Sequence, residues 1–287
     1  MKITAPAKLN LFLHITGRRL DGYHLLESLF VFTDFGDVIS IESAATVSLS
    51  IEGPFASTIA SEPLENNLIY RAALLLKNNY AVTQGAHIVL TKHIPVGAGL
   101  GGGSSDAAAI LKGLNTFWNL NLSVETLCEI GFSLGADVPA CIVGKSAIIS
   151  GIGEMIEPIT LPHTPLFILL INPNYALSTQ SVFREYKAIN TAFTASKKHS
   201  TVFTNPDALF DCLAKNHNDL EPAAIALFPE IQTLLETLQQ QAGCKLARMS
   251  GSGSTCFALF QDLSLAKRAE QIMKTLFPTH WIQLSSI

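Results

Sequence analysis

Residues 95–106, Pro-Val-Gly-Ala-Gly-Leu-Gly-Gly-Gly-Ser-Ser-Asp, contain five glycines. Alternating apolar residues at 86–94 predict a strand before this run, and the apolar run 107–114 predicts a helix after it. Glycine has no side chain to pack, so such a cluster serves backbone conformations that other residues resist, with several amides directed at one place. We expect Ser104 or Ser105 to open the helix, whose N-terminal N–H groups and positive dipole end attract an anion. The run therefore predicts a phosphate-binding turn; the alternative is an ordinary flexible turn.

Composition limits the classes of protein to consider. The 287 residues suffice for two domains or one large one, and 48% of them are hydrophobic. A net charge of -4 and a pI of about 6.1 give no electrostatic reason to expect binding to nucleic acid or to an anionic membrane. The longest apolar runs, such as 165–171, are too short to span a bilayer. The five cysteines form no C-x-x-C pair and no signal peptide is apparent, so we expect reduced thiols in a cytoplasmic protein.

The periodicity predicts an α+β chain with mixed sheets and helices. Strands are expected at 2–15, 24–32, 37–42, 46–52, 86–94, 144–159 (with a turn), 166–171, 245–251, 256–260 and 281–284. Helices are expected at 66–77, 107–114, 123–134, 178–189, 206–213, 219–227, 229–241 and 263–276. The strands between 24 and 52 are expected to be antiparallel. The pattern restarts after Pro165, which predicts two domains, 1–160 and 161–287.

Three familiar nucleotide motifs can be tested against the glycine turn. Residues 97–102 match G-x-G-x-x-G, but no acid follows about 20 residues on to hold a ribose, which argues against a dinucleotide site. The turn lacks the lysine of a Walker A loop. Asp34-Phe-Gly36 spells a protein-kinase triplet, but it precedes the turn and no H-R-D sequence exists, so we interpret it as a hairpin turn. What remains is a nucleotide phosphate held chiefly by backbone amides.

Phosphoryl transfer also needs a positioned hydroxyl, help with its proton and cations near the moving charge. In the first strand Lys8, Asn10, Phe12 and His14 share one face, and the alternative to a functional role is a solvated face. Asp137 lies in Leu-Gly-Ala-Asp-Val-Pro among apolar and small residues, and its alternative role is a turn residue at a helix C-terminus. If Lys8 and Asp137 meet, the lysine would hold the aspartate charged beside the acceptor.

Several motifs together resemble a known kinase superfamily. These are 5–13 with Asp-Gly-Tyr-His at 21–24, the glycine turn at 95–105, 134–139 and Ser-Gly-Ser-Gly-Ser-Thr-Cys-Phe at 250–257. The chain resembles the galactokinase, homoserine kinase, mevalonate kinase and phosphomevalonate kinase (GHMP) superfamily. The first pair of motifs is similar to the subfamily whose acceptor is a methylerythritol carried on cytidine diphosphate, in the non-mevalonate isoprenoid route. The resemblance spans nearly the whole chain.

The resemblance implies a two-domain GHMP-kinase-like fold with the active site in the cleft between an N-terminal nucleotide-binding domain and a C-terminal domain. It implies ATP and Mg²⁺, with phosphorylation of the acceptor's 2-hydroxyl by a catalytic pair, Lys8 and Asp137. The implied ATP site comprises Pro95, Val96, Gly97, Ala98, Gly99, Leu100, Gly101, Gly102, Gly103, Ser104 and Ser105, with Lys92 and Asn67 as further contacts. The implied substrate site comprises Asn10, Tyr23, His24, Thr179 and Phe183, in which aromatic rings enclose the cytosine and His24 binds its polar edge.

The resemblance is incomplete at a few positions. Ala98 stands where the subfamily often has glycine, which is tolerable if its φ stays below zero. No acid is an obvious Mg²⁺ ligand, so either a loop serine with water and phosphates holds the ion or the acid is not recognisable from the sequence. The partner implied is a small molecule, with no nucleic acid or membrane, and the chain is expected as a monomer or homodimer. The rival functions are a sister kinase acting on homoserine or mevalonate phosphates and a non-catalytic nucleotide-binding module.

Overall fold

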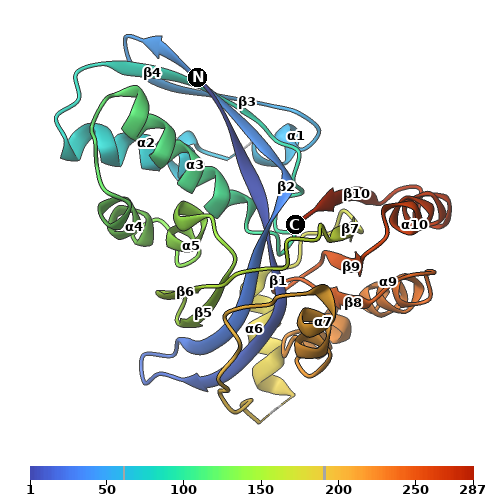
Figure 1. Cartoon of the computed structure of the whole chain (residues 1–287). Coiled ribbons are helices and arrows are strands. Elements are labelled where there is room, and N and C mark those ends of the chain that lie inside the picture. Colours follow the sequence, from blue (N-terminus) through green and yellow to red (C-terminus); the bar gives the residue numbers. More distant parts are fainter. Residues whose placement is uncertain (61, 190–191) are drawn as a thin grey trace. The chain divides into compact units, whose positions relative to one another are not determined.

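A computed structural model describes residues 1–60, 62–189 and 192–287 (Figure 1). The strands are β1 (Lys2–Arg18), β2 (His24–Ala44), β3 (Val47–Glu52), β4 (Gly85–Thr91), β5 (Ala147–Gly151), β6 (Met155–Pro158), β7 (Phe167–Asn172), β8 (Leu246–Met249), β9 (Cys256–Phe260) and β10 (Trp281–Ser286). The helices are α1 (Ala56–Ile59), α2 (Leu68–Asn79), α3 (Gly102–Phe117), α4 (Val124–Phe132), α5 (Val138–Val143), α6 (Thr179–Ala188), α7 (Pro206–Ala214), α8 (Glu221–Leu227), α9 (Glu230–Gln239) and α10 (Leu263–Leu276), with a 3₁₀ turn at Leu64–Asn66. The α+β prediction is confirmed.

The chain forms two compact units that are not contiguous in sequence. The first comprises Met1–Lys8, Phe35–Val96 and Gly101–Lys145, and the second comprises Leu9–Asp34, Gly97–Leu100 and Ser146–Ile287. Strands β1 and β2 therefore contribute residues to both units. The sequence-based boundary near residue 160 stays a prediction.

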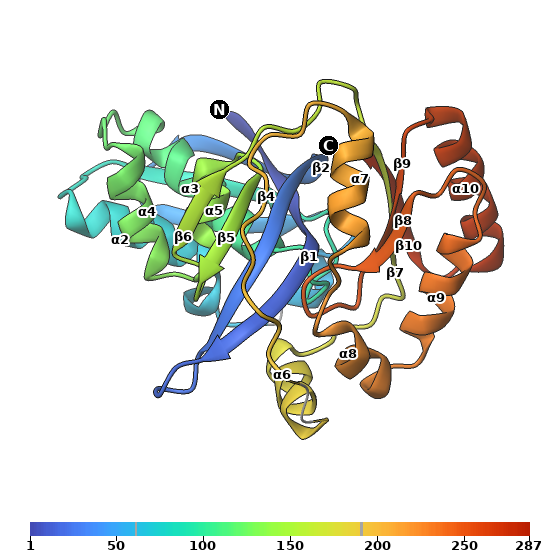
Figure 2. The same cartoon turned by 60° about the horizontal axis from the view of Figure 1, so that its bottom comes forward.

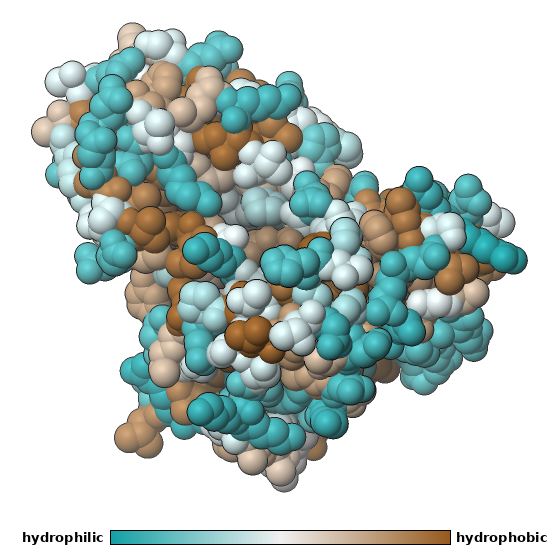
Figure 3. Space-filling model, viewed as in Figure 1, coloured by the Kyte–Doolittle hydropathy of each residue, from teal (hydrophilic) through white to brown (hydrophobic). Residues whose placement is uncertain are grey.

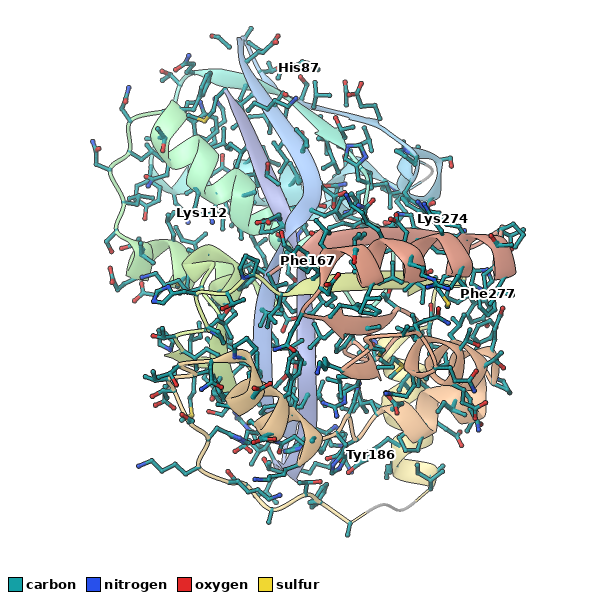
Figure 4. All side chains as sticks on the ribbon, turned by 45° about the vertical axis from the view of Figure 1, so that its right-hand side comes forward. His87, Lys112, Phe167, Tyr186, Lys274 and Phe277 are labelled. Atoms are coloured by element: carbon teal, nitrogen blue, oxygen red, sulfur yellow. The ribbon has the colours of Figure 1, made fainter. Side chains whose placement is uncertain are left out.

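In the first unit, helices cover strands β2, β3 and β4. β4 pairs antiparallel with β2, from Val38 opposite Thr91 to Ala44 opposite Gly85. It pairs parallel with β3, so the expectation that all strands up to residue 52 are antiparallel is wrong for β3. Helices α2 and α3 lie side by side, and α3 also contacts α4 and α5 (Figure 1). Lys112, labelled in Figure 4, donates from α3 to the carbonyl of Cys141 on α5 at 3.4 Å.

The interpretation of residues 34–36 as a hairpin turn is wrong, because β2 runs unbroken through them. Gly36 serves a close approach between strands instead of a turn. A Cβ at Gly36 would lie 2.1 Å from the carbonyl oxygen of Ala5 on β1, which no side chain can accept. The sequence predicts both the glycine and the strand at 2–15, but it does not show that this strand crosses close to Gly36.

The second unit contains an antiparallel four-stranded sheet in the order β10-β7-β9-β8. Helices α9 and α10 pack on it and lie along the same side in Figure 2. Tyr186 on α6 and Phe167 at the start of β7, both labelled in Figure 4, belong to or pack against the buried cluster of this unit. Residues 26–30 of β2 pair antiparallel with β5, which pairs antiparallel with β6.

Polar and apolar residues are interspersed on the face that Figure 3 shows. Within the described residues, no helix has the length and apolar character that crossing a membrane requires. All five cysteines are free thiols, as the sequence predicts.

Candidate active site

The glycine turn takes up backbone conformations that favour glycine at alternate positions. Gly97, Gly99 and Gly101 have φ values of +65°, +73° and +61°. In the described chain Ala98 does not have a positive φ. This is the condition under which its methyl group is tolerated between the two glycines. The turn is therefore an ordered structure specified by its glycines.

Helix α3 begins at Gly102, with Gly101 as its N-cap, and not at Ser104 or Ser105 as expected from their capping propensity. The hydroxyl of Ser105 has another role, because it is buried and donates to the carbonyl of Pro6 at 2.7 Å. Since the first N–H groups of a helix have no carbonyl partner within it, the amides at the start of α3 form an anion-binding end with a positive dipole. Phosphate binding by these amides stays a prediction.

The first half of the turn packs within the second unit. A Cβ at Gly99 would lie 2.3 Å from the carbonyl oxygen of Ser250. Ser250 donates its hydroxyl to the carbonyl of Gly99 at 2.9 Å, and the amide of Thr255 donates to that of Ala98 at 3.2 Å. The second glycine motif, 250–255, therefore supports residues 98 and 99 of the turn.

Lys8 and Asp137 meet within the first unit, although 129 positions separate them. The ammonium nitrogen of Lys8 lies 2.9 Å from Oδ2 of Asp137. The Lys8 side chain is 5% exposed and that of Asp137 is 36% exposed, so the carboxylate can still be reached from solution. The alternative of a solvated face for Lys8 is excluded by its burial, and the predicted contact is confirmed.

The glycine turn reaches this pair through Gly101. A Cβ at Gly101 would lie 2.8 Å from Cε of Lys8, so the absence of a side chain there gives the lysine its position. Asp137 is the N-cap of α5 and makes no side-chain capping hydrogen bond. Helix α5 was missed in the sequence because it is six residues long and uniformly apolar. A helix N-terminus, a lysine and a carboxylate therefore come together in one unit.

Lys92 has a different environment from the one expected of a nucleotide contact. Its amine lies 2.5 Å from Oδ2 of Asp37 and 2.7 Å from Oδ2 of Asp106, and it is buried. Burial opposes its charge, but the two carboxylates outweigh that effect and raise the pKa of Lys92. Burial, opposed by Lys92, raises the pKa of Asp106 to about 7. A direct contact of Lys92 with ATP stays a prediction.

This triad supports the start of α3. A Cβ at Gly102 would lie 3.1 Å from Nζ of Lys92, and the other oxygen of Asp37 accepts from the amides of His93 and Ile94 at 2.6 and 2.8 Å. Sequence reasoning missed Asp37 and Asp106. The signal available was an aspartate directly before Ala-Ala-Ala-Ile-Leu, in a run of small and apolar residues that helix α3 largely buries.

The residues expected around cytosine lie in the second unit. The rings of His24 and Phe183 are stacked, with centroids 4.8 Å apart and planes inclined by 24°. Tyr186 meets His24 edge-on at 6.2 Å. Burial, and then the charge of Arg18, lower the pKa of His24, so its imidazole is neutral near pH 7 and offers one donor and one acceptor. Tyr23 is 64% exposed, and no ring pair involving it occurs in the described residues.

The remaining predicted residues have the following partners. Asn10 is buried and donates to the hydroxyl of Ser28 at 2.8 Å. The hydroxyl of Thr179 lies 2.9 Å from that of Ser252 in the second glycine motif. Asn67 caps α2 by accepting from the amide of Ile69 at 2.9 Å. A contact of Asn67 with ATP stays a prediction.

Known proteins are similar to this chain over nearly its whole length. The model of the GHMP kinase N-terminal domain matches residues 67–145, and that of the GHMP kinase C-terminal domain matches residues 195–279. A 4-diphosphocytidyl-2-C-methyl-D-erythritol kinase of Paramagnetospirillum magneticum is 44% identical over 281 residues, covering 98% of this chain and 96% of its own. The chain belongs to this kinase family. A second relative with the same description, from Parvibaculum lavamentivorans, is 41% identical over 98% of the chain and 96% of its own.

Solved structures give the family the same fold. A crystal structure of 4-(cytidine 5'-diphospho)-2C-methyl-D-erythritol kinase is 32% identical, with a TM-score of 0.79 over 100% of this chain and 98% of its own. A homoserine kinase from Cytophaga hutchinsonii, at 18% identity, covers 100% of this chain and 94% of its own with a TM-score of 0.71, which shows the GHMP fold alone. The resemblance inferred from the motifs is therefore confirmed.

Proposed function

We propose that the chain transfers the terminal phosphoryl group of ATP to the 2-hydroxyl of 4-diphosphocytidyl-2-C-methyl-D-erythritol, giving the 2-phosphate and ADP in the non-mevalonate route to isopentenyl diphosphate. The observation that carries this proposal is the ion pair of Lys8 with Asp137 at 2.9 Å, against Gly101 at the mouth of α3, in a member of this family. Such an arrangement would supply two of the needs of phosphoryl transfer, an anion cradle and a positioned carboxylate.

Asp137 accepts the proton of the attacking hydroxyl. The oxygen of that hydroxyl forms a bond to the γ-phosphorus as the bond from the γ-phosphorus to the β-bridging oxygen breaks, and ADP leaves. Lys8 fixes the carboxylate through the ion pair and adds positive charge near the transferred group. The N–H groups at the start of α3, together with Pro95 to Gly101 before them, bind the phosphate oxygens.

Mg²⁺ would neutralise charge on the β- and γ-phosphates of ATP. Its preference is for oxygen ligands, with few from protein and the rest from water and phosphate. Ser105 is already committed to the carbonyl of Pro6, so Ser104 is the loop serine that remains. Its side chain is next to Gly135, where a Cβ would lie 3.9 Å from the Ser104 hydroxyl, two positions before Asp137. Ser104 would therefore suit an ion held mainly by phosphates and water.

In the second unit, the stacked rings of His24 and Phe183 are assigned to cytosine. Their planes, inclined by 24°, can separate to admit a base, and the neutral imidazole can both donate to and accept from its polar edge. Tyr23, which is exposed and directly precedes His24 in the connection between β1 and β2, supplies a further ring. Asn10 and Thr179 are assigned to the polar groups of the substrate. The free thiols suit the cytoplasm, where we place the enzyme as a monomer or homodimer acting on a small molecule.

The experiment is turnover with matched acceptors. Purified chain with ATP and Mg²⁺ is given the cytidine-linked methylerythritol, homoserine or mevalonate phosphate, and ADP release is followed together with the phosphorus NMR signal of the product. We expect ADP and a new phosphomonoester with the cytidine-linked acceptor only. Turnover with homoserine instead would favour the sister-kinase alternative, and ATP binding without transfer to any acceptor would favour a non-catalytic module.

A further inference from the structure

Three side chains that the kinase reaction does not use come together in the second unit. His14 lies on β1, Glu27 lies on β2, and His199 lies in the segment between α6 and α7. Each offers one ligand atom, and these atoms all lie within 4.8 Å of one another. The side chains of His14, Glu27 and His199 are only 0%, 6% and 6% exposed, so their clustering is not the chance meeting of mobile surface groups.

Glu27 is held with one oxygen directed at both histidines. Its Oε1 lies 2.6 Å from Nε2 of His199 and 3.7 Å from Nδ1 of His14. Its Oε2 accepts from the hydroxyl of Ser196 at 2.7 Å, and the amide of Lys197 approaches both oxygens at 3.4 Å. Metal-ligating carboxylates are oriented in this way by outer hydrogen bonds.

His14 supplies a second, independent observation. Its Nδ1 is buried and has no hydrogen-bond partner, although it faces the carboxylate. Its Nε2 accepts only a 3.5 Å bond from the amide of His217. A buried polar atom without a partner costs free energy, which a ligand would recover.

We propose that His14, Glu27 and His199 form a binding site for a divalent transition-metal ion of the zinc class. Two imidazole nitrogens and one carboxylate oxygen are a donor set typical of zinc, whereas Mg²⁺ prefers oxygen alone. Three protein ligands leave the fourth tetrahedral position for water. The ion would join β1 and β2 to the segment that carries His199, and it is separate from the Mg²⁺ of the kinase reaction.

Binding requires small, definable changes. Zinc–ligand distances of about 2.0–2.2 Å place tetrahedral ligands roughly 3.4 Å apart, so the 2.6 Å contact lengthens and the 3.7 Å contact shortens. The hydrogen of His199 that now lies between Nε2 and Glu27 is replaced by the metal and either moves to Nδ1 or is released to solvent. Ligation through Nδ1 of His14 places that ring's proton on Nε2, so the long bond from His217 opens. No electron transfer is involved.

The test uses the full chain without an affinity tag, treated with chelator, loaded with Zn²⁺ and desalted before elemental analysis. His199→Gln and Glu27→Gln each remove one ligand. The matched control is His280→Gln, because His280 pairs with Glu230 at 2.9 Å in the same kind of contact and belongs to no metal cluster in the described chain. A Co²⁺ titration provides a second readout through visible ligand-field absorption, and it requires no enzyme activity.

We expect one tightly held Zn²⁺ per chain in the wild type and in His280→Gln. Losing a ligand should weaken binding by more than the ~10–100-fold that outer-shell changes cost. Zn²⁺ should also raise the Tm of the wild type and of the control but not that of the two ligand variants, since an ion that binds only the folded state stabilises it. If one of the two ligand variants does not fold, the other provides the same test, and His14→Gln is a third variant that removes one ligand.

The proposal is overturned if the wild type retains no Zn²⁺, or if His199→Gln retains as much as His280→Gln. In either case the cluster is a hydrogen-bonded support for the segment that carries His199. Because metal content is measured without substrates, the outcome does not depend on the kinase function proposed above.

Discussion

Replacing Gly101 with alanine tests whether the position of Lys8 matters to the reaction. Gly101 has φ +61°, and an added Cβ would lie 2.8 Å from Cε and 3.2 Å from Cβ of Lys8. Placing an L-residue in this left-handed conformation costs about 1–2 kcal/mol. The clash with Cε can be relieved by the side chain, because Cε is near its flexible end, whereas the contact with Cβ requires a shift of a few tenths of an ångström. However, Nζ is bonded to Cε, so that relief draws the ammonium away from Asp137 at 2.9 Å.

The expected result is a small loss of stability with a large loss of turnover. A cost of about 1–2 kcal/mol lowers Tm by roughly 2–3 °C in a chain of 287 residues. A displacement of about 1 Å in a catalytic group can lower the rate about 10²-fold. Thermal unfolding and ADP release with the cytidine-linked acceptor measure the two effects on the same preparation.

Gly103→Ala is the matched control for stability. Its Cβ would meet only Cδ1 of Leu68, at an ordinary 3.4 Å, and its φ is not positive. Because alanine is a better helix former than glycine, this change should raise stability by about 0.5–1 kcal/mol. If Gly101→Ala lowers Tm as expected but keeps turnover within about threefold of the wild type, the inferred link between the glycine, Lys8 and catalysis is wrong.

Three further changes test other parts of the site. Asp137→Asn should lower turnover by ~10²–10⁴-fold and leave the affinity for ATP nearly unchanged, because it removes the proton acceptor; normal turnover would show that another group takes the proton. Phe183→Ala should raise the KM for the cytidine-linked acceptor by an amount equivalent to ~1–3 kcal/mol of lost stacking, and an unchanged KM would place cytosine elsewhere. The Asp106 pKa of about 7, above its usual 3.8, gives stability that is fully present below pH ~4 and is lost as the pH rises through 7. In urea titrations, the free energy of unfolding of Asp106→Asn should therefore fall less between pH 4 and pH 7 than that of the wild type. An equal fall in the two proteins would contradict the raised pKa of Asp106.

Local chemistry explains what could be predicted from the sequence. The helices at 123–134 and 178–189 begin where a serine can accept an amide hydrogen, and the structure has Ser123 and Ser178 as N-caps. The helix after the glycine turn was expected to start at a serine for the same reason. It starts at Gly102 instead, because the turn needs a left-handed residue at 101. The hydroxyl of the buried Ser105 is not available as a cap because it donates to the carbonyl of Pro6.

Some contacts between residues far apart in the sequence could be predicted from a motif, and others could not be predicted from any feature of the sequence. Lys8 and Asp137 could be paired in advance because each lies in a stretch with a family resemblance and a chemical purpose. Asp37, which binds Lys92, lies in a segment that reads as an ordinary strand, and Asp106 ends the glycine run without any sign of its contact with Lys92. His14, Glu27 and His199 have spacings typical of no metal motif, so only the fold shows that they meet.

Three glycines show which part of a contact the sequence predicts and which part only the fold supplies. At Gly36, Gly99 and Gly101 an added Cβ would lie 2.1, 2.3 and 2.8 Å from atoms of Ala5, Ser250 and Lys8. In each case the sequence marks the position where another segment must come close, but the approaching atom is a strand carbonyl, a turn carbonyl or a side chain that only the fold identifies. A glycine therefore predicts that another segment approaches its backbone closely, but it does not show which residue of that segment makes the contact. At Gly101 that residue is the lysine that holds Asp137, which is why a residue with no side chain is expected to influence turnover.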